Sequence, residues 1–139
     1  MLPVFVYGTL RHGCCNYNRI LAENTLTERP AQLPNTVMFG LGMGFPYVAE
    51  TEASTHVVGE LMDIDPDVYE AVLAQLDQLE GYHPESDHNH YDRVERTVIL
   101  ADGSVTQAWV YLLTDHKRIN RFTARAVVTT GDWLEPVAA

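Results

Sequence analysis

Short apolar segments alternate with turns that contain glycine or proline along most of the chain. The first apolar segment is rich in valine and aromatic residues and stops at Gly8, which is typical of a buried strand leading into a loop. Two later segments flank Asp102-Gly103, a dipeptide that favours a hairpin turn. Strands are therefore predicted over residues 2–7, 57–64, 91–100 and 105–113.

A different pattern, with apolar residues every three or four positions, predicts a helix over residues 66–80. Asp65 is a favourable N-cap, Pro66 is tolerated at the first helical position, and Gly81 is a typical C-terminal stop. The apolar stripe of this helix is about 120° wide at ~100° per residue. It consists of Tyr69, Val72, Leu73, Leu76 and Leu79. A shorter helix is expected over residues 16–23.

One acidic residue, Glu80, lies inside this apolar stripe, whereas Asp77 falls near its edge. Glu80 is therefore expected to point toward the core or a cavity within it. Burial and the negative end of the helix dipole both favour a protonated carboxyl, so they raise its pKa. Such a group is suited to general acid–base chemistry near neutral pH. The structural alternative is a frayed helix end, with Glu80 turned to solvent beside Gly81.

The remaining segments are less regular. Three glycines between residues 40 and 44 mark a loop that ends at residues 45–47, and residues 118–130 are compatible with a helix or with irregular structure. The order strand, helix, strands, helix and hairpin favours an α+β fold, with a curved sheet or small barrel and helices packed on it. No repeat or linker interrupts the chain, so one domain is expected over residues 1–139.

Charge and cysteine content narrow the class of partners. Nine basic and nineteen acidic residues give a net charge of −10, which disfavours nucleic acids and anionic membranes as partners. The apolar runs are far shorter than the ~20 residues that span a bilayer, and no signal-peptide pattern is visible. Cys14 and Cys15 are adjacent, a poor arrangement for a disulfide, which favours a reducing cytoplasmic location. A monomer is the default expectation.

Six short blocks, spread from Val4 to Trp133, carry a family resemblance. They are residues 4–11 (VFVYGTLR, with Gly13 and Asn16 following), 58–61 (VGEL), 76–82 (LDQLEGY), 91–94 (YDRV), 108–111 (AWVY) and 131–133 (GDW). Their order and spacing resemble the gamma-glutamylcyclotransferase-like family. Within that family, the chain resembles small bacterial members of the gamma-glutamylamine cyclotransferase type.

The resemblance implies a small mixed, mainly antiparallel β-barrel with flanking helices. It also implies an enzyme without metal or cofactor that releases 5-oxoproline from gamma-glutamyl compounds, because the substrate's own α-amine attacks its γ-carbonyl. Glu80 would be the general base and acid. The backbone of Gly8, Thr9 and Leu10 would hold the substrate's α-carboxylate, a role for which a strand that breaks at glycine is suited. The pocket would be lined by Tyr7, Tyr91 and Tyr111.

Other interpretations predict different behaviour. The His- and Asp-rich segment 87–92 could bind a metal, although a solvated loop explains it as well. Asp77 and Glu80 form an i, i+3 carboxylate pair, but they stand side by side rather than flanking a sugar, as a glycosidase requires. A non-catalytic protein that binds a small ligand or a partner on the same fold is the main alternative to the enzyme. The leaving amine, and a role of residues 115–130 as a lid, stay open.

Overall fold

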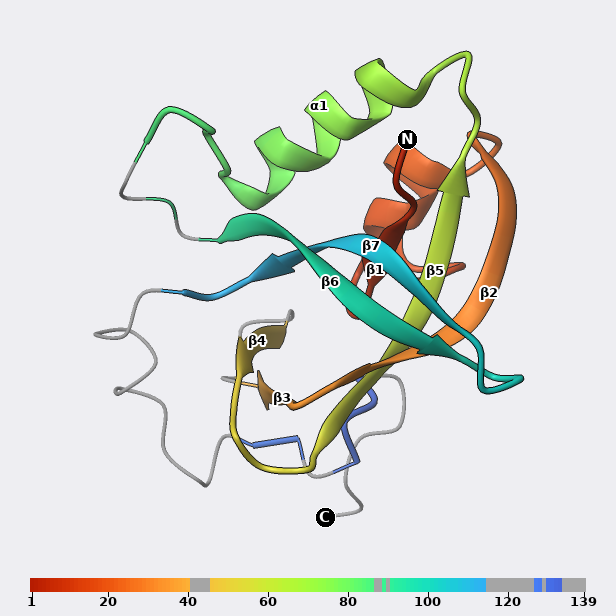
Figure 1. Ribbon diagram of the computed structural model, residues 1–139. Helices are drawn as coiled ribbons and strands as arrows, with labels where there is room; N and C mark the ends of the chain where they lie inside the picture. Colours follow the sequence, from red (N-terminus) through yellow and green to blue (C-terminus); the bar gives the residue numbers. More distant parts are fainter. Residues whose placement is uncertain (41–45, 87–88, 90, 115–126, 129, 134–139) are drawn as a thin grey trace.

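The computed structural model describes residues 1–40, 46–86, 89, 91–114, 127–128 and 130–133. Its elements are β1 (Val4–Val6), the π-helix η1 (Tyr17–Leu21), β2 (Thr25–Pro34), β3 (Thr36–Gly40), β4 (Pro46–Glu50), β5 (His56–Ile64), α1 (Tyr69–Glu80), β6 (Asp92–Leu100) and β7 (Val105–Leu112). Five strands close a barrel in the order β1-β5-β2-β6-β7, and β3 and β4 form a separate hairpin (Figure 1). Only the β1–β7 pair in the barrel is parallel, so the predicted mixed, mainly antiparallel barrel is confirmed.

β1 is buried on both faces, and so is the second half of β7, from Ala108 to Leu112, apart from the half-buried Trp109. Along β1, Val4 and Val6 pack toward α1 and η1, whereas Phe5 belongs to the cluster that fills the barrel. The alternation of side chains along a strand explains this division. On β5, Gly59 lets the barrel close tightly, because a Cβ atom there would lie 2.0 Å from the backbone oxygen of Val6.

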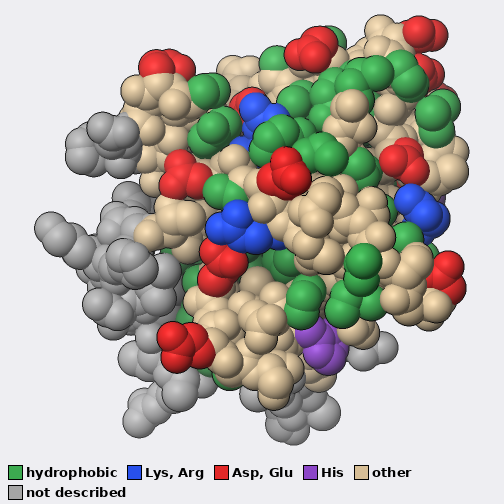
Figure 2. Space-filling model, in the orientation of Figure 1, with side chains coloured by type: hydrophobic (Ala, Val, Ile, Leu, Met, Phe, Trp, Pro, Cys, Tyr) green, Lys and Arg blue, Asp and Glu red, His purple; other side chains and the backbone are tan. Residues whose placement is uncertain are grey.

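The long helix is confirmed, but it begins later than predicted. Asp65 accepts a hydrogen bond from the backbone N–H of Asp67 at 2.9 Å, and the resulting turn continues to Val68, whose φ of −123° is not helical. The first helical residue is therefore Tyr69. Gly81 ends the helix with a φ of 69°, as predicted. Among the described residues, no helix has the length and apolar composition needed to cross a membrane. Apolar, acidic and basic side chains are interspersed over the face drawn in Figure 2.

Three strands were not predicted. β2 contains two prolines and several polar residues, yet it pairs with β5 along its length and with β6 over a short stretch. β3 and β4 pair from Thr36↔Glu50 to Gly40↔Pro46, so the predicted loop lies at the turn of a hairpin. The predicted β6–β7 hairpin is confirmed, and so is the short helix at η1. The interpretation of residues 118–130 falls mostly outside the described residues.

Candidate active site

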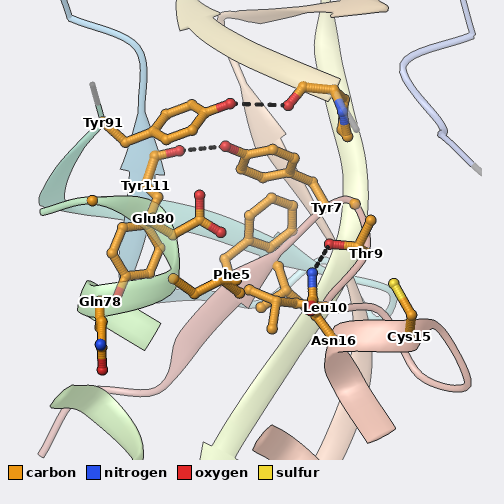
Figure 3. Close-up of a pocket in the computed structure, with 15 residues that line it drawn as sticks. Phe5, Tyr7, Thr9, Leu10, Cys15, Asn16, Gln78, Glu80, Tyr91 and Tyr111 are labelled. Carbon is orange, nitrogen blue, oxygen red and sulfur yellow. Dashed lines mark hydrogen bonds between the residues drawn. The ribbon is translucent and has the colours of Figure 1, made fainter. Parts of the chain in front are cut away.

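A cavity of about 560 Å³ opens where β1 ends, between the last turn of α1, the residue that precedes β6, and β7 (Figure 3). Its lining combines residues from distant parts of the sequence. Every residue proposed for the site from the sequence lies on this cavity: Tyr7, Gly8, Thr9, Leu10, Glu80, Tyr91 and Tyr111.

The turn after β1 is held by short-range hydrogen bonds. The backbone N–H of Arg11 donates to the Gly8 carbonyl at 3.0 Å, and the Thr9 carbonyl accepts the N–H groups of Asn16 and Tyr17 at 3.1 and 3.2 Å. The Asn16 amide also donates to the Thr9 hydroxyl at 2.8 Å (Figure 3). Within the described part of the chain, no acceptor pairs with the backbone N–H groups of residues 8–10. These three groups are therefore available for an anion.

Gly8 has a steric reason to be glycine. A Cβ atom at this position would lie 2.8 Å from both Cγ and Cδ of Pro46. The Pro46 ring thus packs directly on the backbone of the turn, on the same side as the pocket. Any larger residue would push the turn and Pro46 apart.

Arg11 anchors the far end of the same turn to the rest of the molecule. Its guanidinium forms ion pairs with Glu60 on β5 at 3.3 Å and with Asp132 at 2.5 Å. Arg11 is 9% exposed, so these pairs are largely shielded from solvent. The neighbouring His12 turns away from the pocket, with a 67% exposed side chain and a 2.6 Å contact to Glu28.

Three buried tyrosines surround the cavity, and each hydroxyl is already bound. Tyr7 donates to the Tyr111 carbonyl at 2.5 Å, and Tyr91 donates to the Pro46 carbonyl at 3.2 Å (Figure 3). Tyr111 donates to Asp77 Oδ1 at 2.7 Å. Burial raises the pKa of all three phenols. At Tyr111 the hydrogen bond to Asp77 raises the pKa further. They are therefore neutral at physiological pH and shape the pocket without carrying charge.

Glu80 differs from the three tyrosines because its carboxyl has no partner among the described residues. It projects into the cavity from the last turn of α1, and it makes no hydrogen bond or ion pair with any described residue (Figure 3). Burial raises the pKa of this carboxyl to about 7. A group with this pKa can both accept and donate a proton near neutral pH.

The sequence analysis missed several residues at this site. Asn16, Pro46 and Gln78 also line the cavity, as does the exposed thiol-bearing Cys15. The sequence drew attention to Asn16 only through its spacing from the first block. Pro46 reaches the cavity through its contact with Gly8, and no local sequence pattern predicts such a contact. Leu79, placed on the buried stripe, is instead 36% exposed at the cavity.

The structure gives little support for a metal centre in the part of the chain that it describes. No group of three or more His, Cys, Asp or Glu side chains there is arranged to hold an ion. In the segment 87–92, residues 87, 88 and 90 lie outside the described residues. The amide of Asn89 donates to the carbonyl of His83 at 3.0 Å and to the carboxylate of Asp92 at 3.1 Å.

Comparison with solved structures defines the fold class. An AIG2-like protein from Mus musculus superposes with a TM-score of 0.63 at 23% identity, covering 91% of this chain and 82% of that one. This likeness shows that the barrel with its crossing helix is the fold of AIG2-like proteins.

Sequence comparison goes further and shows the family. The model of the gamma-glutamyl cyclotransferase, AIG2-like family matches residues 4–135, and the chain belongs to this family. A putative gamma-glutamylcyclotransferase of Vibrio cholerae is 32% identical over 134 residues, which cover 96% of each chain. Another from Methanocaldococcus jannaschii is 33% identical over 114 residues, covering 78% of this chain and 81% of the relative. The protein is thus an enzyme of the cyclotransferase type.

Proposed function

We propose that this enzyme releases 5-oxoproline from gamma-glutamyl amines or gamma-glutamyl peptides, with Glu80 as the proton carrier. The observation that carries the proposal is the unpartnered Glu80 carboxyl in the cavity, with a pKa raised to about 7. At this pKa both protonation states are populated near neutral pH, as a residue that acts as base and then as acid requires.

In the proposed complex, the substrate's α-carboxylate binds the turn after β1. The backbone N–H groups of Gly8, Thr9 and Leu10 supply the donors, and they have no other acceptor among the described residues. Tyr7 and Tyr91 would pack against the glutamyl chain and keep it folded. A folded chain places the α-amine close to the γ-carbonyl carbon, so that ring closure is nearly unimolecular.

The reaction then needs one proton carrier, which acts twice because the α-nitrogen loses two protons on its way from an ammonium group to a ring amide. The Glu80 carboxylate accepts a proton from the substrate's α-ammonium group, and the freed amine attacks the γ-carbonyl carbon. A new nitrogen–carbon bond closes the five-membered ring while the bond from that carbon to the leaving amine breaks. Glu80 returns this proton to the leaving nitrogen, then takes the second proton from the ring nitrogen and passes it to the released amine. The products are 5-oxoproline and a free amine, and no water, metal or cofactor is consumed.

A reducing compartment such as the cytoplasm fits this proposal. Cys14 and Cys15 are both free thiols, and Cys15 lies at the cavity, where oxidation would add bulk beside the substrate. We therefore expect the enzyme to work where thiols stay reduced.

The test is turnover of a substrate panel without added metal. Purified protein is incubated with gamma-glutamyl dipeptides, simple gamma-glutamyl amines and ε-(gamma-glutamyl)lysine, and 5-oxoproline is measured. Wild type is expected to form product, and Glu80→Gln is expected to fold normally and lose at least about a hundredfold in turnover. Glu70→Gln is the matched control, because Glu70 is an exposed carboxylate on the same helix.

The outcomes separate the enzyme from a ligand-binding protein on the same fold. A Glu80→Gln variant that keeps wild-type turnover would exclude the proton-relay role. Tight binding of the panel compounds without any product from wild type would favour a binding protein. The best substrate among those turned over would define the leaving amine.

A further inference from the structure

A partly buried ion pair beside the pocket joins helix α1 to the β6–β7 hairpin. Arg93 Nε lies 3.0 Å from Asp77 Oδ1, and the two side chains are 15% and 17% exposed. The same carboxylate oxygen accepts the Tyr111 hydroxyl. Arg93 Nε is buried and has no hydrogen-bond partner among the described residues, so its contact with Asp77 is electrostatic. The reaction scheme above gives this pair no role.

Strand register explains why Arg93 reaches this point. Arg93 on β6 lies directly opposite Tyr111 on β7, and Trp109 lies two residues earlier on the same face. The guanidinium stacks on both neighbouring rings, 4.6 Å from the centroid of Trp109 and 5.4 Å from that of Tyr82. Stacking between two rings requires a planar cation, which favours arginine over lysine.

These contacts bracket Glu80 along the chain. Asp77 is one helical turn before Glu80, and Tyr82 is two residues after it. Arg93 binds both, so it ties the end of α1 and the residues that follow Gly81 to the barrel. Movement of the Glu80 backbone would have to break at least one of these contacts.

The pair also places two opposite charges at the helical turn next to Glu80. Residues three apart on a helix have Cβ atoms ~5–6 Å apart, so an ionised Asp77 alone would oppose ionisation of Glu80. The other titratable groups that line the cavity from the described elements are the neutral phenols of Tyr7, Tyr91 and Tyr111 and the thiol of Cys15. Arg93 supplies the cation that cancels the charge of Asp77.

We propose that Arg93 is a positioning residue of this enzyme, which neutralises Asp77 and clamps the last turn of α1 so that Glu80 alone exchanges a proton with the substrate. This inference rests on the proposed role of Glu80. It predicts that removing Arg93 and removing Asp77 shift the ionisation of Glu80 in opposite directions, because these two partners of the clamp carry opposite charges.

The test measures the ionisation of Glu80 directly, without turnover. Protein labelled with ¹³C at the glutamate carboxyl is titrated by NMR, and Glu80→Gln assigns the signal. Arg93→Met leaves Asp77 uncompensated, and the Glu80 midpoint is expected to rise by about one pH unit. Asp77→Asn leaves Arg93 uncompensated, and the midpoint is expected to fall by about the same amount. The double variant is expected to return close to wild type.

Matched controls come from the exposed pair Arg96–Glu50, in which Arg96 lies on the same strand as Arg93, Glu50 ends β4, and the two make a 2.8 Å contact. Arg96→Met and Glu50→Gln change the net charge equally, and the Glu80 midpoint is expected to move by less than about 0.3 pH units. Arg93→Lys keeps the charge but not the stacking. It is expected to keep the midpoint while lowering kcat at unchanged KM.

Two results would overturn the proposal. One is a Glu80 midpoint that stays fixed in both single variants, and the other is a shift in the same direction in both, which would indicate general loosening. If Arg93→Met does not fold, the nearly isosteric Asp77→Asn decides the question by its downward shift. Absence of product from wild type would instead refute the proposed function, and the NMR titration would still test the clamp.

Discussion

Replacing Glu80 with glutamine should change how the stability of the protein depends on pH. Burial raises the pKa of this carboxyl from its usual 4.5 to about 7 in the folded protein, whereas the unfolded chain keeps a value near 4.5. Between these two values the folded state binds more protons than the unfolded state. The free energy of unfolding therefore falls as the pH rises through this window, and the loss is complete above about pH 7.

The size of the effect follows from the shift. At about 1.4 kcal/mol per pKa unit, a rise from 4.5 to about 7 corresponds to a loss of up to about 3 kcal/mol. Glutamine cannot ionise, so this component vanishes in the variant. Every other titrating group contributes equally to both proteins and cancels in their difference.

Urea unfolding of both proteins, at several values between about pH 4.5 and about pH 8, measures that difference. The variant should gain up to about 3 kcal/mol over wild type across the range, with most of the gain between the two pKa values. Glu70→Gln, an exposed control on the same helix, should show a flat difference. A flat difference for Glu80→Gln as well would mean that the carboxyl is solvated in the folded protein, and the reasoning about its pKa would be wrong.

Two glycine substitutions test the packing around the site and within the barrel. Gly8→Ala places a methyl group 2.8 Å from the Pro46 ring, so the turn must shift. In steady-state assays, KM for gamma-glutamyl substrates should rise at least about tenfold, whereas urea unfolding should show a loss of stability of only about 1–3 kcal/mol. An unchanged KM would show that the turn does not hold the substrate. Gly59→Ala places a methyl group 2.0 Å from the backbone oxygen of Val6, so β1 and β5 must separate, and urea unfolding should show a loss of more than about 3 kcal/mol. A loss below about 1 kcal/mol would mean that the barrel is looser than its strand register indicates.

Local patterns predicted the elements that carry their own signal. The helix that became α1 has a clear apolar stripe and a glycine stop, and its boundaries were wrong only at the start, where Asp65 closes a turn on Asp67. The β6–β7 hairpin has alternating apolar residues around an Asp-Gly turn. Helical periodicity also placed the Glu80 carboxyl on the apolar face, independently of the family resemblance.

The strand β2 shows why other elements were missed. Pro30 and Pro34 cannot donate to a strand ladder, and the polar residues between Thr25 and Arg29 give little apolar alternation. The strand exists because β5 pairs with it from Thr25 to Pro34. Its stability therefore comes from long-range pairing rather than from local preference.

The amino-acid sequence by itself determined the chemistry that the molecule can offer: a misplaced carboxyl at Glu80, a glycine that breaks the first strand, and the family to which these residues belong. Only the tertiary structure decided which groups are free. It bound the hydroxyls of Tyr7, Tyr91 and Tyr111 to other partners and paired Asp77 with Arg93. Among the described residues, nothing pairs with the carboxyl of Glu80 in the cavity. The reason is physical, since a side chain's pKa depends on burial and on neighbours that lie far away in the sequence, and barrel closure alone brings those neighbours together.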